Sequence, residues 1–293
     1  TMNTNPLFFF DTADVEYIRQ TWSKIKHCVN PKSVAGITTN PNAFHKIGAT
    51  SIQQWKEKTL ELCQLVSEIR GDEFGVVYVQ QPNSKMKSDD VLLWGAEVAS
   101  WGDGQTRIGL KIPPFKNVLE IANQLSAVSL LEVNVTGVSD CSTALRAFSY
   151  GVDYVSIIPG RMEEEGIDAK AQVAFASQRS AGSSKIITGS MRTIEGLKWV
   201  CEYGTVPTIG SRVWDKIFEE SSPEEFVTFW QNKQDAAECL FSPHVDEKMT
   251  SLSESFFKQM DELSAQVYAE FNQTHIEAQA EVDENTPEED FNF

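Results

Sequence analysis

The chain is poor in cysteine, has fewer basic than acidic residues, and contains no long apolar run. Its five cysteines are widely spaced and form no CxxC motif, so we expect reduced thiols and no metal site or disulfide framework. The 25 Lys and Arg residues against 42 Asp and Glu residues give a net charge of -17. This balance argues against nucleic acid and anionic membranes as partners. Without a membrane-spanning run or a recognisable signal peptide, we expect a cytoplasmic protein.

Acidic residues are concentrated near the C-terminus. Residues 277–293 contain seven acidic side chains and no Lys or Arg. Such a stretch cannot bury enough apolar surface to fold alone. We therefore expect a single domain over residues 1–275, followed by an acidic, disordered tail over residues 276–293.

Short apolar stretches alternate with longer amphipathic ones along the chain. The expected strands are 7–11, 34–40, 74–81, 107–113, 129–136, 153–160, 185–190 and 205–210. Apolar strands joined by helices indicate a parallel sheet. Eight such units fit an α/β fold of the (β/α)₈ TIM-barrel type, with additional C-terminal helices. The alternative is a doubly wound open sheet, which usually has a glycine-rich first turn; here the first turn reads DTAD.

A lysine stands near the end of the fourth expected strand, in the sequence RIGLKIP. Burial favours the neutral form of a lysine, and a neutral amine is a nucleophile. Lys111 is therefore a candidate catalytic residue. The alternative is a solvated lysine whose charge reaches the surface and does no chemistry.

The other strands end in polar residues as well, and in a TIM barrel the chemistry lies at these ends. They are Asp11, Thr38, Thr39, Asn40, Gln80, Gln81, Asn134, Thr136, Ser156, Arg161, Ser190 and Arg192. A neutral lysine could attack a ketone to form an iminium ion, while Asp11 moves protons. Arg161 and Arg192, with Ser156 and Ser190, suggest a clamp for phosphate.

Each of these residues also has a simpler interpretation. Asp11 could cap the first helix, and Asn40 with its following proline could form an ordinary turn. Arg161 could pair with the acidic residues that follow it, and Ser190 and Arg192 could be ordinary loop residues. Their occurrence at the same point of successive strand–helix units favours a shared site.

Six short motifs occur in an order and spacing that resemble one known family. They are DTAD (11–14), GITTNP (36–41), LKIP (110–113), NVT (134–136), SIIPGR (156–161) and ITGSMRT (187–193). The chain resembles the transaldolase family, which includes the fructose-6-phosphate aldolases. The resemblance implies a (β/α)₈ barrel, a class I Schiff-base mechanism, phosphorylated sugar substrates, and neither metal nor cofactor.

The resemblance also implies roles for individual positions. Lys111 would form the Schiff base, Asp11 would act as acid and base, and Thr136 would hold the catalytic water. Asn40, with Thr39 beside it, and Asn134 would contact substrate hydroxyls. The phosphate would be bound by Ser156, Arg161, Ser190 and Arg192. The site residue of the third strand is placed at Gln80, with Tyr78 and Gln81 as alternatives.

The activity implied is that of a transaldolase of the pentose phosphate pathway. It would transfer a dihydroxyacetone unit from a ketose phosphate, fructose 6-phosphate or sedoheptulose 7-phosphate, to an aldose phosphate. The family has an aromatic residue two positions after the sixth-strand serine, where this chain has Ile158. This departure and Gln80 leave open a fructose-6-phosphate aldolase that uses free dihydroxyacetone. A non-catalytic sugar-phosphate-binding barrel and a homo-oligomer also remain open.

Overall fold

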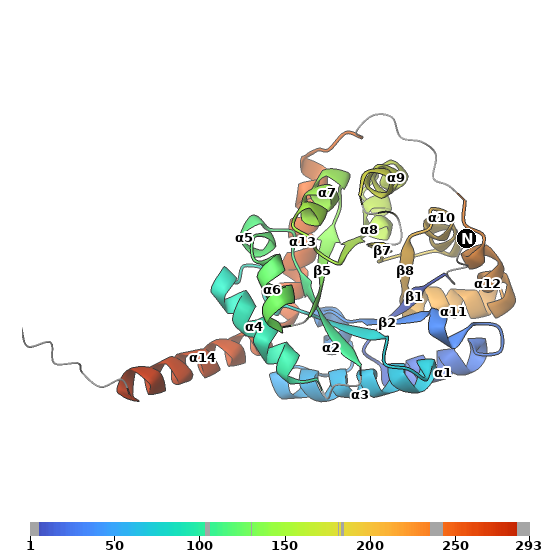
Figure 1. The fold of residues 1–293 in the computed structure, drawn as a ribbon. Helices are drawn as coiled ribbons and strands as arrows, with labels where there is room; N and C mark the ends of the chain where they lie inside the picture. The colour runs from blue at the N-terminus through green and yellow to red at the C-terminus, as the bar shows by residue number, and fades with distance from the viewer. Residues whose placement is uncertain are drawn as a thin grey trace, which may run out of the picture.

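Eight parallel strands close into a barrel surrounded by helices (Figure 1). The structure is a computed structural model, and it describes residues 6–102, 106–129, 131–180, 182, 185–234 and 243–285. The first strand pairs with the second on one side and with the eighth on the other. This closure confirms the predicted TIM barrel and excludes the open sheet.

The strands and helices alternate along most of the chain. The strands are β1 (Phe8–Asp11), β2 (Val34–Thr38), β3 (Val76–Gln80), β4 (Arg107–Ile112), β5 (Glu132–Val138), β6 (Tyr154–Ile157), β7 (Ile186–Thr188) and β8 (Val206–Ile209). The helices are α1 (Val15–Ile25), α2 (Pro41–Lys46), α3 (Ile52–Arg70), α4 (Ser88–Ser100), α5 (Lys116–Leu119), α6 (Ala122–Ser129), α7 (Cys141–Ser149), α8 (Pro159–Glu164), α9 (Ala169–Arg179), α10 (Ile194–Glu202), α11 (Ser211–Glu220), α12 (Pro223–Gln231), α13 (Glu247–Leu263) and α14 (Ala265–Asn285).

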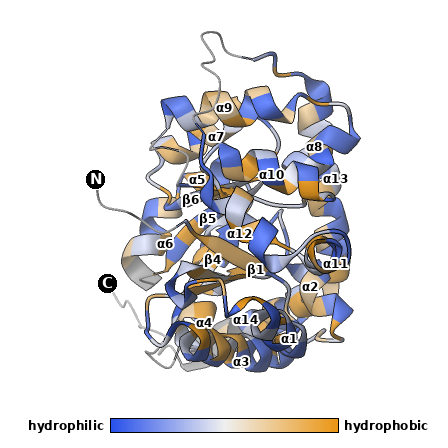
Figure 2. Ribbon diagram, turned by 90° about the vertical axis from the view of Figure 1, so that its right-hand side faces the viewer, coloured by the Kyte–Doolittle hydropathy of each residue, from blue (hydrophilic) through white to orange (hydrophobic). Residues whose placement is uncertain are grey.

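The side chains of each strand alternate between the barrel interior and the layer of helices. In β4, Ile108, Leu110 and Ile112 belong to the main core that the helices cover. Figure 2 shows that these helices carry both hydrophilic and hydrophobic residues, as expected for elements with one buried face. The alternate positions, Gly109 and Lys111, therefore face the barrel interior.

A second, smaller apolar cluster fills the lower part of the barrel interior. It consists of Phe9, Val76, Tyr78, Ile187 and Val206. Gly109 makes room for it, because a Cβ atom at this position would lie 2.3 Å from the Tyr78 ring. The interior below the level of Lys111 is therefore packed with side chains.

Helix α12 packs on the helix-facing side of β1, near the start of that strand. The rings of Phe226 and Trp230 lie 6.1 and 5.3 Å from the ring of Phe8, measured between centroids. The indole nitrogen of Trp230 also donates a hydrogen bond to the Leu7 carbonyl at 3.4 Å. Because Phe8 belongs to the main core beneath the helices, α12 is part of the helix layer around the barrel.

Helix α13 lies on loops at the opposite, C-terminal end of the strands. The hydroxyl of Ser253 donates a hydrogen bond to the Gly137 carbonyl at 2.7 Å, after the polar part of β5. Asp261 accepts hydrogen bonds from the backbone and the hydroxyl of Ser84, in the loop after β3. The predicted additional C-terminal helices are therefore present, and α13 reaches the mouth of the barrel.

Helix α14 extends away from the barrel (Figure 1). It continues to Asn285, so residues 276–285 are helical where we expected disorder. The reason is local: the segment is rich in Ala, Gln and Glu, which favour helices, and Gln273 donates a hydrogen bond to Glu277 one turn later. The remainder of the expected tail, residues 286–293, lies outside the described residues.

No helix in the described part of the chain combines the length and apolar character that crossing a bilayer requires.

Candidate active site

The register of the barrel brings the polar strand ends to one level. Lys111 pairs with Gln80 of β3 on one side and with Asn134 of β5 on the other. On the opposite part of the barrel, Asp11 pairs with Thr38 of β2. Residues far apart in the sequence therefore face a common space at the C-terminal end.

Lys111 is buried inside the barrel, with 5% of its surface exposed. Its amine donates a hydrogen bond to the Thr39 carbonyl at 3.0 Å. Burial lowers the pKa of Lys111 to about 8, and the attraction of Asp11 opposes this shift. At pH 7 about one amine in ten is then neutral, against about one in 2,500 for a free lysine. The alternative of a solvated lysine is excluded.

Asp11 is held by a short chain of hydroxyl groups. Its carboxylate accepts a hydrogen bond from Thr38 at 3.0 Å, and Thr38 lies 2.5 Å from the hydroxyl of Thr208. Burial raises the pKa of Asp11, although the Lys111 charge and the Thr38 hydrogen bond counteract part of the rise. The side chain of Asp14, not Asp11, caps α1. Asp11 is thus not occupied as a helix cap, and a raised pKa suits a group that exchanges protons.

Two buried amide groups flank Lys111 with hydrogen-bonding capacity left over. Asn134 is fully buried, and its oxygen accepts a hydrogen bond from the Ser156 hydroxyl at 2.8 Å. The Asn134 amide nitrogen and the Gln80 amide oxygen have no partner within the described structure. Because unpaired buried polar groups are costly, these atoms are candidates for contact with a bound ligand.

Of the three candidates for the third-strand position, the geometry favours Gln80. Tyr78 lies two residues deeper in the barrel, in the interior apolar cluster, and its hydroxyl donates to Glu132 at 3.4 Å. The amide nitrogen of Gln81 donates to the Asn83 carbonyl at 2.9 Å, in the loop beyond the strand. Gln80 alone is in register with Lys111.

A cavity of about 400 Å³ opens at the C-terminal end of the barrel. Of the predicted site residues, it is lined by Asp11, Asn40, Arg161, Ser190 and Arg192. The others do not line it: Lys111, Thr39, Gln80, Asn134, Thr136 and Ser156 are buried beside or beneath it. Ser156 therefore contacts Asn134 and does not face the cavity with the arginines, in contrast to its expected place in a phosphate clamp.

The two arginines differ in their surroundings. The guanidinium of Arg161 lies 5.1 Å from the centre of the Phe256 ring, and its Nε has no hydrogen-bond partner among the described residues. Arg192 donates through Nε to Glu164 at 3.0 Å. Of the acidic residues after Arg161, Glu164 thus pairs with Arg192, and no ion pair with Arg161 forms among the described residues, in contrast to the simpler interpretation. Burial and the neighbouring Arg192 charge lower the pKa of Arg161. The negative charge of an anion in the cavity would counteract both the cost of burying the Arg161 charge and its repulsion by Arg192.

The segments that carry these arginines, α8 and the loop after β7, are fixed by close backbone packing. Ser190 has a φ angle of 58°, which is rare for a residue other than glycine. Gly160 lies against it, since a Cβ atom at Gly160 would come within 1.7 Å of the Ser190 carbonyl oxygen. Such strain is typical of functional sites. On the other wall, Asn40 caps α2 by accepting a hydrogen bond from the Ala43 amide at 2.8 Å.

Several further cavity residues were not identified from the sequence, and four of them define its charge and shape. Lys46 and Arg212 bring the cationic residues of the lining to four, against Asp11 and Asp14, in a chain whose net charge is -17. Phe256 and Met260 of α13 form an apolar wall. Arg212 follows β8 closely and could have been found from its strand-end position. The contribution of α13 could not, because it depends on where that helix docks.

Comparison with known proteins is consistent with this arrangement. Residues 8–281 match the family described as Transaldolase/Fructose-6-phosphate aldolase. The chain belongs to this family. A "Probable transaldolase" of Streptococcus agalactiae serotype V is 26% identical over 233 residues, covering 77% of this chain and 97% of that protein. A protein of the same name from Methanococcus maripaludis is 28% identical over 235 residues, covering 76% and 97%. One from Herpetosiphon aurantiacus is 26% identical over 237 residues, covering 78% and 96%.

Proposed function

We propose that the protein is a transaldolase that works through a Schiff base on Lys111. The observation that carries the proposal is the burial of Lys111 beneath a cationic cavity, with a pKa lowered to about 8 and an electrostatic interaction with Asp11 across the barrel. Membership of the family and the names of the relatives support the same activity. The substrates would be phosphorylated sugars of the pentose phosphate pathway, and the protein would act in the cytoplasm.

In the first half-reaction, the neutral Lys111 amine attacks the ketone carbon of the ketose phosphate. The ketone oxygen leaves as water, and an iminium ion forms. Asp11 then accepts the proton of the C4 hydroxyl, and the C3–C4 bond breaks. Its electron pair moves toward the iminium nitrogen, which leaves an enamine on Lys111 and releases an aldose phosphate.

In the second half-reaction, the enamine carbon attacks the aldehyde carbon of another aldose phosphate. Asp11 returns its proton to the new alkoxide oxygen. Water then adds to the iminium carbon, the C–N bond breaks, and the new ketose phosphate leaves. Thr136 is assigned to the catalytic water, while Gln80, Asn134 and Asn40, with Thr39 beside it, are assigned to contacts with substrate hydroxyls.

The phosphate would bind between Arg161 and Arg192, with Ser190 as an additional donor. All three residues line the cavity, and a phosphate would supply the partner that Arg161 Nε lacks. Lys111 itself donates to the Thr39 carbonyl and does not line the cavity. Reaction therefore requires its side chain to rotate from that carbonyl toward the substrate.

A fructose-6-phosphate aldolase that uses free dihydroxyacetone is the second candidate. It is favoured by the neutral amide of Gln80 next to Lys111 and by the buried aliphatic side chain of Ile158. Neither residue supplies an acidic or phenolic group near the iminium carbon, so the control of water there differs from what the family resemblance implies. The two activities share the Schiff base and differ only in the need for an acceptor.

The decisive experiment is borohydride trapping with fructose 6-phosphate, followed by peptide mapping. We expect a dihydroxyacetone-sized adduct on Lys111 and none in Lys111→Met. Repeated turnover that requires added aldose phosphate would identify the transaldolase, whereas repeated turnover with release of free dihydroxyacetone and no acceptor would identify the aldolase. An unmodified Lys111 in a folded protein would contradict both and leave a sugar-phosphate-binding barrel.

A further inference from the structure

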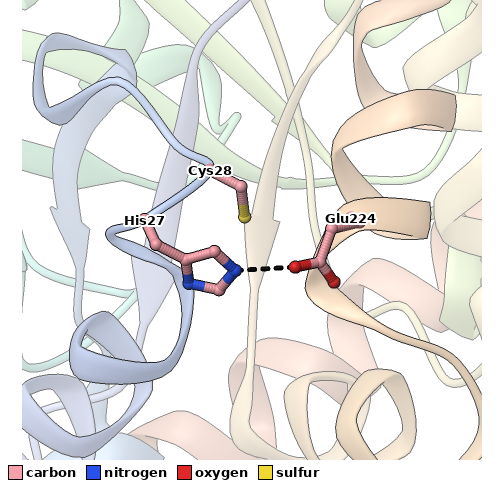
Figure 3. Close-up of side chains that lie close together, drawn as sticks. All are labelled: His27, Cys28 and Glu224. Atoms are coloured by element: carbon pink, nitrogen blue, oxygen red, sulfur yellow. Dashed lines mark hydrogen bonds and ion pairs between the residues drawn. The ribbon is translucent and has the colours of Figure 1, made fainter.

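Three side chains with metal-binding atoms meet on the surface between α1 and α12. His27 and Cys28 follow the end of α1, and Glu224 lies in the first turn of α12 (Figure 3). One ligand atom from each lies within 4.8 Å of the other two. This is the single group of this kind in the part of the chain that the structure describes. It is separate from the cavity residues and independent of the proposed function.

The backbone on both sides of the cluster is fixed. The Cys28 amide donates to the Ile25 carbonyl at 3.0 Å, which holds the turn after α1. Glu224 lies on a capped helix start, where Ser222 accepts a hydrogen bond from the Glu225 amide at 3.2 Å. Only the ends of the side chains remain adjustable, because His27 and Glu224 are 55% and 62% exposed. A ligand could therefore be bound without rearranging the fold.

We propose that His27, Cys28 and Glu224 form a binding site for a divalent cation of the zinc class. Imidazole nitrogen, thiolate sulfur and carboxylate oxygen are the three donor types that zinc accepts, usually in tetrahedral geometry. A deprotonated Cys28 and Glu224 would neutralise the two positive charges of the ion. Water would complete the coordination on the exposed side.

The distances require only a small adjustment. Nε2 of His27 lies 2.7 Å from Oε1 of Glu224, within hydrogen-bond distance. Two such ligands on a tetrahedral zinc are separated by about 3.4 Å, given bonds of about 2.1 Å. The exposed carboxylate and imidazole can separate by this amount through rotation of their side chains. Sγ of Cys28 donates weakly to the Ile25 carbonyl at 3.3 Å and would exchange its proton for the metal.

Two simpler interpretations of the cluster predict different behaviour. An exposed His27–Glu224 pair would contribute little by itself and would need no cysteine. A reactive redox thiol usually has a cationic neighbour, whereas Cys28 lies next to the Glu224 carboxylate. Neither interpretation accounts for three different ligand types converging from segments 197 residues apart.

The position of the cluster indicates a structural role for the metal. Helix α12 packs on the start of β1 through Phe226 and Trp230, whose rings contact that of Phe8. A metal bridging the turn after α1 and the first turn of α12 would hold α12 in place against the barrel. It would stabilise the folded protein in proportion to its affinity and concentration, without entering the active site.

The test uses the full, untagged chain, treated with a chelator and then titrated with Zn²⁺. We expect one equivalent to bind and to raise the melting temperature. His27→Gln, Cys28→Ser and Glu224→Gln should each weaken binding by about tenfold or more. Matched controls are Glu225→Gln, which removes the neighbouring carboxylate, and His45→Gln, which removes an exposed histidine on α2. Both should bind Zn²⁺ as the parent does.

Cobalt provides a second readout that does not depend on stability. Co²⁺ bound at the site should show a thiolate-to-metal absorption band that disappears in Cys28→Ser. The proposal would be overturned by the absence of stoichiometric binding, or by equal affinity in the three ligand variants. A cobalt spectrum without the sulfur band in the parent protein would also overturn it.

Discussion

Lys111 and Asp11 act on each other's ionisation from opposite parts of the barrel interior. Burial disfavours the charged form of both groups, and the attraction between their charges counteracts it. The lysine thus has a pKa of about 8, while the pKa of the acid is raised. This relationship predicts how formation of the Schiff base should depend on pH.

Trapping of the Schiff base by cyanoborohydride should accelerate as the pH rises toward 8 and then level off. The reason is that the neutral fraction of Lys111 increases about tenfold per pH unit below its pKa. Asp11→Asn should move the rise to lower pH, because it removes the charge that raises the pKa of Lys111. The rate of adduct formation, measured by mass spectrometry between pH 5.5 and 9, provides the test. An unchanged profile in Asp11→Asn would show that the two groups are not coupled.

Lys111→Met should abolish turnover and increase stability. The pKa of Lys111 is lowered in the folded protein, so the unfolded chain binds more protons between about pH 8 and 10.4. Stability therefore rises with pH through this window, and the full cost of the buried charge is present below it. At pH 7 this cost is about 3 kcal/mol, and methionine would remove it at similar volume. Urea denaturation of both proteins at pH 7 and 10 should show a difference that shrinks at the higher pH.

Arg161→Gln should raise the KM for phosphorylated sugars by roughly 10- to 100-fold, the range expected for loss of a hydrogen bond to a charged group. The KM for free dihydroxyacetone in the aldol direction should change much less. Arg179→Gln is a matched control, because Arg179 also lies over an aromatic ring, that of Phe175, but does not line the cavity. Equal effects on phosphorylated and unphosphorylated substrates would remove Arg161 from the phosphate site.

Gly109→Ala should destabilise the protein by about 1–3 kcal/mol, the usual cost of overpacking an interior. Its Cβ would lie 2.3 Å from the ring of Tyr78, which the interior cluster holds in place. Gly102→Ala is the control, since the nearest atom to its Cβ would be at 3.6 Å. Chemical denaturation of the two variants measures the difference. Similar stabilities would mean that the Tyr78 ring can move aside.

The order of the strands and the positions of the polar residues could be read from the chain. Local alternation in β4 is enough to place Lys111 on the opposite face of the strand from Ile112. The positions of Asp11 and Asn134 at the ends of their strands were enough to identify them as candidate site residues. The structure of residues 276–285 could not be predicted from composition, which indicates disorder in a segment where α14 continues to Asn285. Helix propensity and side-chain pairs along the helix were the local factors that composition did not capture.

The sequence by itself determined the closed barrel, through eight apolar strands separated by helical segments, and the level at which its polar residues collect. Only the tertiary structure decided which of these residues line the cavity and which, like Ser156, are turned toward a neighbour. The tertiary structure also decided that the Phe256 ring lies against the Arg161 guanidinium and that the Glu224 carboxylate lies next to the His27 imidazole. The physical reason is that strand periodicity is a local property, whereas contacts between helices distant in sequence depend on how whole elements pack.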